Sequence, residues 1–480
     1  MISSWINGLL CLVSHSFQKV GIFYLIKGGS RMNQALVKEE LQTLVFSGQE
    51  QARLLELLRQ MQPYDLSEIL RDLDVDFQLE LISHLSLAQA AEVLEYLEPE
   101  LTYELLSRMD DTVTSLLIKQ MSSDMVVDLL LAIHPLQAEK LQRLLPADYR
   151  KKINQLMTYP EDTAGGLMTV DYVAARAYWT GEQTIQHIRK VGYEAEIVSY
   201  VYVTDKRGKL FGVASLKEII LADPKTPLSD IAKTDIISVP AETEQEEVAS
   251  VISRYGFYAV PVVDRQNRLI GIVTYDDVVE VIQEEATEDI QKIGGSQPLT
   301  EPYFKTSIWS LYRKRIVWLF VLFVGGAYTA TVLESYQSTL DQVVALSFFI
   351  PLLIGTGGNT GSQIVTTLIR ALGVGEIKFQ DLFRVIQKEL LTGLFLGISL
   401  GLIGFIRAWI MGVTFDIAYV VALAAMFIVI WSSIVSAALP LILSRLKADP
   451  AVVSGPLIST LVDGTGLIIY MTIAKIILEL

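Results

Sequence analysis

The sequence predicts a multidomain membrane protein with an N-terminal all-α helical solenoid, then a tandem pair of α/β units, then a five-helix transmembrane domain. Residues 32–160 contain short amphipathic runs at helical spacing, and residues 178–290 contain an internal repeat that alternates strand and helix. Five apolar segments follow, each reaching the roughly 20 residues that a helix needs to cross a bilayer. We expect an N-terminal extension at 1–31, the helical domain at 32–160, the tandem units at 161–284, a connecting helix at 285–312 and the transmembrane domain at 313–480.

Charge separates the soluble part from the membrane part. The 480 residues include 39 Lys or Arg and 54 Asp or Glu, so the formal charge is 39 − 54 = −15. Residues 1–311 carry 28 basic and 45 acidic side chains, a balance of −17, whereas residues 312–480 carry 11 and 9, a balance of +2. The acid excess therefore lies in the soluble part, which argues against nucleic acid as a partner because phosphate binding needs a basic surface.

Several classes of protein are excluded by what the sequence lacks. The four histidines, at positions 15, 84, 134 and 187, all precede the membrane region, so an intramembrane H-E-x-x-H protease is excluded. Cys11 is the only cysteine, which rules out an intramolecular disulfide and a cysteine-rich metal site. The P-loop pattern is absent, so the chain carries no ATPase motor of that type. We expect a protein that is not an enzyme.

The helical region is punctuated by proline. Runs such as QARLLELLRQM and SDMVVDLLLAI place apolar residues on one helix face, and Pro63, Pro99, Pro135 and Pro146 can each begin or break a helix. Short helices at nearly regular spacing predict the small solenoid. We assign no function to residues 1–31, which contain two modest apolar runs and no clear signal-peptide cleavage site.

The internal repeat has an offset of 59 residues. The segment SYVYVTDKRGKLFGVASLKEII, from Ser199, aligns without gaps on YAVPVVDRQNRLIGIVTYDDVV, from Tyr258. Each copy is typical of a strand, an Asp-led turn, a second strand with Gly and a helix. The pair resembles a tandem CBS-domain pair, a cytosolic module that often senses adenine nucleotides or ions; the alternative is a scaffold of two βαβ units.

A nucleotide site is an option at this pair. The second copy has the G-h-h-[ST]-x-x-D ribose pattern, with Thr274 and Asp277, whereas the first copy has Glu218 in place of the Asp. The resemblance therefore implies ATP at Thr274 and Asp277 as an optional ligand.

Loop charges predict the orientation of the membrane domain. The five predicted spans are Ile316–Leu333, Val343–Leu372, Leu390–Met411, Ile417–Leu443 and Ser454–Leu478. Lys and Arg precede the first span, follow the second and follow the fourth, and the loops after the first and third spans have none. By the positive-inside rule, the N-terminal domains are cytoplasmic and the C-terminus is outside. The predicted location is the plasma membrane or the bacterial inner membrane.

Polar and conformationally permissive residues cluster in two spans. The second span contains PLLIGTGGNTGSQ, in which Asn359 lies among glycines, and we expect unwound backbone there, with close helix packing through small residues as the alternative. The fifth span contains Asp463, the one acid deep in a span, with Ser459 one turn before it. Burying a carboxylate at this depth is costly, so Asp463 is expected to be a cation ligand; a structural pair with Arg407 is the alternative.

These motifs together resemble the MgtE family of magnesium channels, from about Met32 to Leu480. PLLIGTGGNTGSQ, DPAVVSGPLISTLVDGTGLIIY, TAGGLMT at Thr163 and EEATEDI at Glu284 occur in the family's order. The resemblance implies a homodimer whose second and fifth spans line a central pore, with Mg²⁺ ligands drawn from Asp463, Ser459, Asn359 and Thr366. Two positions depart from the family pattern: Gly455, where the pattern has Asn, and Gly256, where it has an acid.

The resemblance also implies that cytosolic Mg²⁺ closes the pore by bridging three regions. The matching acids are Glu92, Asp124 and Asp128 in the helical domain, Glu244, Glu246 and Asp277 in the tandem pair, and Glu285, Glu288 and Asp289 in the connecting helix. Mg²⁺ dehydrates reluctantly and prefers oxygen ligands, so a wide site of carboxylates suits it. The predicted function is Mg²⁺-selective uptake gated by cytosolic Mg²⁺; the alternative is a CBS-regulated carrier for another divalent cation or solute.

Overall fold

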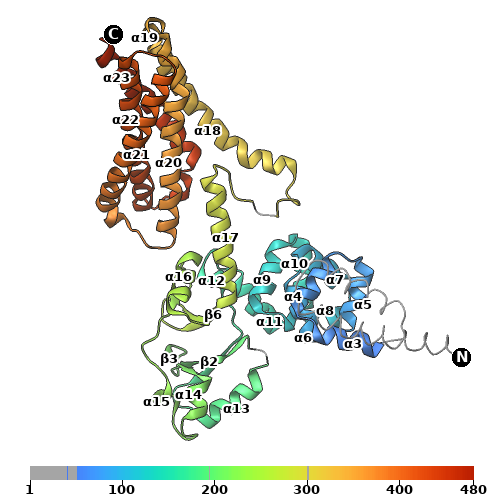
Figure 1. Cartoon of the computed structure of the whole chain (residues 1–480). Helices are drawn as coiled ribbons and strands as arrows, with labels where there is room; N and C mark the ends of the chain where they lie inside the picture. Colours follow the sequence, from blue (N-terminus) through green and yellow to red (C-terminus); the bar gives the residue numbers. More distant parts are fainter. Residues whose placement is uncertain (1–40, 42–50, 194, 300–301, 480) are drawn as a thin grey trace, which may run out of the picture. The chain divides into compact units, whose positions relative to one another are not determined.

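The computed structural model describes residues 41, 51–193, 195–299 and 302–479 (Figure 1). The predicted extension at residues 1–31 lies outside the described residues. The chain divides into two compact units, Met1–Val279 and Glu280–Leu480, and each is described by itself. Within the described residues the predicted fold class is confirmed: a helical N-terminal domain, a tandem α/β pair with two small mixed sheets, and five long apolar helices.

The N-terminal domain consists of helices of nine or ten residues, most of them separated by short turns. They are α3 (Gln51–Gln60), α4 (Pro63–Arg71), α5 (Val75–Ser83), α6 (Leu87–Glu95), α7 (Pro99–Arg108), α8 (Asp111–Gln120), α9 (Ser123–Ala132), α10 (Pro135–Leu144) and α11 (Ala147–Leu156). Pro63, Pro99 and Pro135 begin their helices, where the missing N–H costs nothing, and Pro146 immediately precedes α11, so the proline prediction is confirmed.

From α4 to α9, each helix packs mainly on the helix two places further along the chain. The pairs are α4 with α6, α5 with α7, α6 with α8, α7 with α9, α8 with α10 and α9 with α11. Buried polar side chains close the ends of earlier helices: the Thr102 hydroxyl donates to the carbonyl of Leu94 at 3.1 Å, and the Thr114 hydroxyl to that of Leu106 at 2.8 Å. These bonds satisfy carbonyls that a helix leaves unpaired at its C-terminus.

The two copies of the repeat form two three-stranded sheets of the same topology. The first copy comprises β1 (Tyr172–Arg176), α13 (Gly181–Val191), β2 (Ile197–Thr204), β3 (Leu210–Ser215), α14 (Leu216–Leu221) and α15 (Leu228–Ile231). The second comprises β4 (Val239–Pro240), α16 (Gln245–Tyr255), β5 (Ala259–Val263), β6 (Leu269–Thr274) and α17 (Tyr275–Ile293), while α12 (Ala164–Leu167) packs on its strands and helix. In each sheet the first pair of strands is parallel and the second is antiparallel.

The register of the strands confirms the repeat. Val203 pairs with Gly212 in the first copy, and Val262 pairs with Gly271 in the second, at the offset of 59 found in the sequence. The two copies also exchange equivalent hydrogen bonds, from Leu210 N–H to the Asn267 carbonyl at 3.0 Å and from Leu269 N–H to the Gly208 carbonyl at 3.2 Å. This reciprocity shows a local pseudo-twofold relation between the copies.

The second unit is built around α22. Its elements are α18 (Ile308–Ser335), α19 (Gln337–Gln342), η1 (Val344–Phe349), α20 (Ile350–Gly373), η2 (Phe379–Asp381), α21 (Leu382–Ile410), α22 (Phe415–Arg445), η3 (Pro450–Val452) and α23 (Gly455–Leu478). Helix α22 packs against α20, α21 and α23, whereas α18 packs on α23. In the described part of this unit, five helices are long and apolar enough to cross a membrane, as predicted.

Three details differ from the sequence-based expectations. The backbone from Ile350 to Gly373 is continuous helix, so the expected unwinding is wrong and the alternative of close packing holds. A Cβ at Gly357 would lie 2.6 Å from Ile428, and one at Gly358 would lie 2.8 Å from the Ser459 hydroxyl, so only glycine permits these approaches. Among the basic residues that follow the second predicted span, Arg384 and Lys388 lie in α21 and not in a loop, because that helix begins before its apolar segment.

The third difference is that the connecting helix ends early. Helix α17 ends at Ile293, and Gly295 follows it with a φ of +73°. The Ser296 N–H bonds to the Gln291 carbonyl at 3.0 Å and the Gly295 N–H to the Lys292 carbonyl at 2.8 Å. Only glycine adopts this left-handed conformation without strain, so the local sequence stops the helix well before α18.

Candidate metal sites

The predicted pore residues lie on α20 and α23, which pack against each other. Asn359 and Thr366 are exposed in the single chain, on the face of α20 that also carries Gln363 and Arg370 at helical spacing. Ser459 and Asp463 are half-buried on α23, and the Ser459 hydroxyl lies 3.5 Å from that of Ser362 on α20. The structure therefore groups the predicted residues along two adjacent helices.

Asp463 has no ion pair with Arg407 within the described residues, so the structural pairing that the sequence left open is not what the structure contains. Arg407 lies in the last turn of α21, and α21 packs chiefly on α22. The residue after Asp463, Gly464, lies against Tyr328 and Thr329 of α18. Asp463 thus remains a half-buried carboxylate among hydroxyls and small residues.

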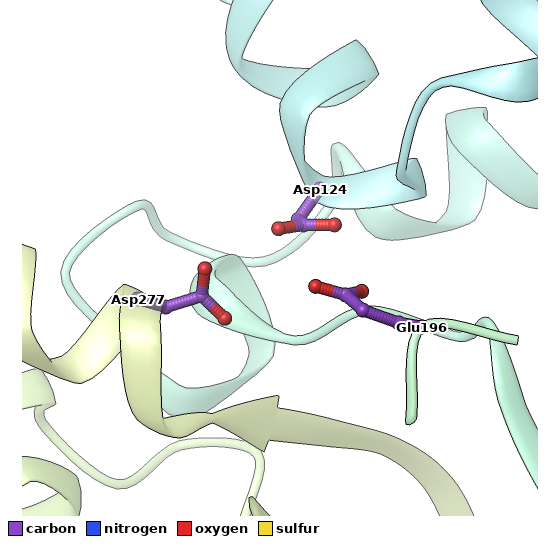
Figure 2. Close-up of side chains that lie close together, drawn as sticks. All are labelled: Asp124, Glu196 and Asp277. Carbon is purple, nitrogen blue, oxygen red and sulfur yellow. The ribbon is translucent and has the colours of Figure 1, made fainter. Parts of the chain in front are cut away.

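A second group of carboxylates lies in the first unit, and it joins three segments that are far apart in the sequence. Asp124 of α9, Glu196 before β2 and Asp277 of α17 each offer an oxygen within 4.8 Å of the others, and the carboxylates point toward one another (Figure 2). Asp124 and Asp277 lie in the first turns of α9 and α17, where the positive ends of the helix dipoles favour negative charge. We call these three residues the acid triad.

Asp124 is the most confined member of the acid triad. Its side chain is 5% exposed and its Oδ1 atom has no hydrogen-bond partner. Burial and the charge of Asp277 raise the pKa of Asp124 well above its usual value. A buried carboxylate oxygen without a partner is costly, so this arrangement fits an oxygen-binding cation, for which Mg²⁺ has the right ligand preference.

Glu196 completes the acid triad from its rim. Much of the residue is exposed, but desolvation of its carboxylate and the charge of Asp277 raise the pKa of Glu196 to about 8. The charged neighbours with the largest effects on Asp124 and Glu196 are all acids, which include Asp128, Asp276 and Glu95. The acid triad is therefore a group of acids that bind protons more tightly than isolated carboxylates do, because each ionised member would face other acids.

Sequence reasoning found Asp124 and Asp277 but missed Glu196 and the nearby Glu95. Glu95 accepts a hydrogen bond from the Ser122 N–H at 2.7 Å, and burial raises the pKa of Glu95. The only sequence signal for Glu196 is an acidic residue just before the first strand of the repeat, which is too common to single it out.

Four other acids that are predicted to bind cytosolic Mg²⁺, which we call the sensor residues, are exposed and are not members of the acid triad. Glu92 and Asp128 are exposed on α6 and α9, while Glu244 and Glu246 are exposed at the start of α16. The position with Gly256 in place of an acid has a φ of +65° and ends α16 in the left-handed conformation. A glycine is therefore favoured there for a backbone reason.

The end of α17 brings a further group of acids together in the second unit. Glu285, Glu288 and Asp289 share one helix face at spacings of three and four. Burial, followed by the charge of Asp449, raises the pKa of Asp289, and Asp289 also lies near Gly373 at the end of α20. Asp289 is thus next to the segment that precedes α23 and to the end of α20.

The predicted nucleotide residues are already bonded to each other. Thr274 is fully buried, and its hydroxyl and N–H both donate to Asp277 Oδ2, the N–H at 3.3 Å. In the first copy, Glu218 plays the same part: its carboxylate accepts from the Ser215 N–H at 2.9 Å and from the Ser215 hydroxyl at 2.8 Å. In both copies, the hydroxyl residue and the acid at these positions therefore form the start of a helix, α14 in the first copy and α17 in the second.

Comparison with known proteins gives consistent matches along the chain. The MgtE intracellular N domain matches residues 61–162, the CBS domain matches 228–284, and the MgtE divalent cation transporter domain matches 350–473. The magnesium transporter MgtE of Thermus thermophilus is 40% identical over 75% of this chain and 80% of its own length. The magnesium transporter MgtE of Bacillus subtilis is 33% identical over 87% of this chain and 92% of its own length.

Two solved structures are similar in sequence to the N-terminal part of this chain. The cytosolic domain of the Mg²⁺ channel MgtE in complex with ATP is 37% identical, covers 51% of this chain and 99% of that one, and has a TM-score of 0.48. The soluble part of a magnesium transporter is 31% identical, covers 53% of this chain and 99% of that one, and has a TM-score of 0.49.

Proposed function

The chain belongs to the MgtE family of magnesium transporters, and we propose that it conducts Mg²⁺ along α20 and α23 and is closed by cytosolic Mg²⁺. As a member of this family it transports magnesium, is not an enzyme, and is a multi-pass membrane protein with a cytosolic N-terminal domain. The pore residues, the gating and the subunit arrangement are our proposal.

The observation that carries the proposed pore is the polar face of α20. Asn359, Gln363 and Thr366 are exposed on a helix whose opposite face is buried against α22 and α23. Exposed amides in hydrocarbon are unfavourable, so this face is expected to contact protein or water. Asp463 and Ser459 of the adjacent α23 add oxygens next to it.

A homodimer would place two such faces around one axis. Two copies of Asp463 would then give a charge of −2 in a narrow, oxygen-lined path, which attracts divalent cations and repels anions. Mg²⁺ keeps its waters tightly, so hydroxyls, amides and carboxylates at a distance suit its hydrated form. The functional unit is therefore proposed to be a homodimer.

The proposed gate uses the two groups of cytosolic acids. Without a divalent ion the carboxylates of the acid triad repel each other, and so do those of Glu285, Glu288 and Asp289. Mg²⁺ bound by these acids would join the segments that carry them and favour the closed state, since a ligand shifts a conformational equilibrium toward the state that binds it better. The sensor residues Glu92, Asp128, Glu244 and Glu246 stay predictions.

Flux into liposomes tests the pore. We expect Mg²⁺ uptake by wild type to exceed that of Ca²⁺, Ni²⁺ and Co²⁺, and Asp463→Asn to lose most of its Mg²⁺ flux because one charge per chain is removed. Asp463→Glu keeps the charge and is expected to be impaired less. Asp416→Asn, a matched change at an exposed acid at the start of α22, is expected to conduct like wild type.

Normal conduction by Asp463→Asn would contradict the proposed role of Asp463 in the pore. If Asp463→Asn conducts normally while Arg407→Ala prevents folding, Asp463 has a structural role and the ligand lies near Asn359. A wild type that carries another divalent cation or solute in preference to Mg²⁺ would support the alternative carrier.

Orientation and nucleotide binding have separate tests. The C-terminus is predicted to lie outside, so a reporter after Leu480 is expected to be extracytoplasmic and one at Met32 cytoplasmic; the same side for both would remove one span. ATP at Thr274 and Asp277 is tested by nucleotide titration of the full chain, with Asp277→Asn expected to weaken binding.

A further inference from the structure

Helix α17 carries a lysine at the place where it meets the segment before α23. Lys292 Nζ donates to Asp449 Oδ2 at 2.6 Å and also pairs with Glu288, one turn earlier on the same helix. Its side chain is 26% exposed, so this ion pair is partly shielded from water. One ammonium thus joins a proposed Mg²⁺ sensor acid to the segment that leads into α23.

Asp449 is itself fixed to the start of α23. Its other oxygen, Oδ1, accepts from the Ala451 N–H at 2.8 Å and so begins η3. Ser454 then caps α23 by accepting from the Leu457 N–H at 3.3 Å, and it accepts from Trp318 Nε1 of α18 at 3.0 Å. A short, hydrogen-bonded segment therefore connects Asp449 to α23, the helix that carries Asp463, so a displacement of Asp449 is expected to displace the start of α23.

The far side of Lys292 is equally constrained. The turn after α17 is closed by Gly295, where a Cβ would lie 2.6 Å from Trp318. The Leu299 N–H donates to Gln291 Oε1 at 2.7 Å, and the Gln297 N–H donates to the Lys314 carbonyl at 3.1 Å. The end of α17 is thus held between the starts of α18 and α23, which keeps Lys292 within reach of Asp449.

The charges around Lys292 are otherwise acidic. Asp289 and Glu288 lie on its own helix and Asp449 faces it from the segment before α23. Burial lowers the pKa of Lys292, but its hydrogen bonds to Asp449 and Glu288 outweigh this effect and hold the pKa above its usual value. The side chain stays a cation at every physiological pH.

We propose that Lys292 is a tethered cation that occupies Glu288 and Asp449 in the absence of Mg²⁺ and competes with cytosolic Mg²⁺ for this acidic face of α17. Its positive charge offsets part of the negative charge of Glu288 and Asp449, and this weakens the attraction of Mg²⁺ to these acids. Lys292 therefore raises the Mg²⁺ concentration at which the pore closes. Lys292 is a positioning residue that acts through Glu288. The inference rests on the proposed closure by Mg²⁺ at α17.

The test is the Mg²⁺ concentration that halves the open probability, measured in excised patches with Mg²⁺ varied on the cytosolic side. For Lys292→Met we expect this concentration to fall about threefold or more, the size of a lost partly exposed ion pair. Lys292→Arg retains the charge and is expected to stay within about twofold of wild type. A half-closing concentration that is unchanged or higher in Lys292→Met overturns the proposal.

Two controls separate this proposal from general charge effects and from failure of the gating model. Arg384→Met removes one positive charge elsewhere in the same unit, where Arg384 pairs with Asp381 at 3.9 Å, and is expected to leave the half-closing concentration unchanged. If Lys292→Met does not fold, Lys292→Gln replaces it, and Mg²⁺-dependent protection of the full chain from protease gives a second readout with the same expected direction. A wild type that does not close in Mg²⁺ contradicts the proposed function, whereas a wild type that closes beside an unshifted Lys292→Met contradicts only the role of Lys292.

Discussion

The acid triad and the end of α17 are both built from carboxylates that face one another, but they balance charge in different ways. At the end of α17, Lys292 bonds to Glu288 and Asp449. In the acid triad, the nearby Lys152 is engaged with Asp171 at 2.6 Å, and acids dominate the effects on Asp124 and Glu196. The end of α17 therefore carries its own cation, whereas the acid triad is proposed to take one from solution.

The largest expected effect comes from neutralising the acid triad. In the variant Asp124→Asn, Glu196→Gln, Asp277→Asn, we expect Mg²⁺ to lose most of its effect on hydrogen exchange in residues 120–130. In wild type, Mg²⁺ at 100 times its dissociation constant would stabilise this region by about 2.7 kcal/mol. The variant Glu100→Gln, Asp148→Asn, Glu247→Gln neutralises three exposed acids of the same unit and is the matched control. Equal Mg²⁺ protection in both variants would locate the ion elsewhere.

A smaller effect is expected when the acid triad is given its own cation. Glu196→Lys places an ammonium beside Asp124 and Asp277, as Lys292 does for its neighbours, so the Mg²⁺-free protein is expected to melt a few degrees higher than wild type. The Mg²⁺-dependent rise in melting temperature should shrink at the same time. At a pH above about 8, where Glu196 is ionised in the wild type, Glu196→Gln removes its charge without adding a cation and should lie between the two. A Glu196→Lys protein that melts lower without Mg²⁺ would contradict the comparison.

The smallest effect is a pH dependence. Desolvation raises the pKa of Glu196 from 4.5 to about 8, so the folded state binds its proton more tightly than the unfolded state does. The stability from this proton is complete below about pH 4.5 and is lost as the pH rises through about 8. Without Mg²⁺, the melting temperature of wild type is expected to fall across this window, more than that of Glu196→Gln. With saturating Mg²⁺ the difference between the two proteins at high pH should diminish, and equal curves without Mg²⁺ would remove Glu196 from the acid triad.

Local sequence determined most of the architecture. Proline at helix starts, the 59-residue repeat and five long apolar segments predicted the helical domain, the paired sheets and the membrane helices, because periodicity and backbone chemistry act over a few residues. The same local rules misjudged α20, where glycines suggested unwinding. Whether a glycine breaks a helix or lets another helix approach depends on a neighbour such as Ile428, which lies far away in the chain.

The candidate functional residues also differ in whether the sequence alone reveals them. Asp463 is recognisable from sequence alone because a carboxylate within an apolar span is rare and costly. Asp124 and Asp277 were found through resemblance to a family, but Glu196 joins them only because the chain folds its segment beside the starts of α9 and α17. Likewise, Lys292 is one of many charges in an acidic helix, and only the position of Asp449, 157 residues later, makes it an internal cation. Sequence fixes which charges exist, whereas tertiary structure decides which of them must share one small volume, and electrostatic energy depends on that distance.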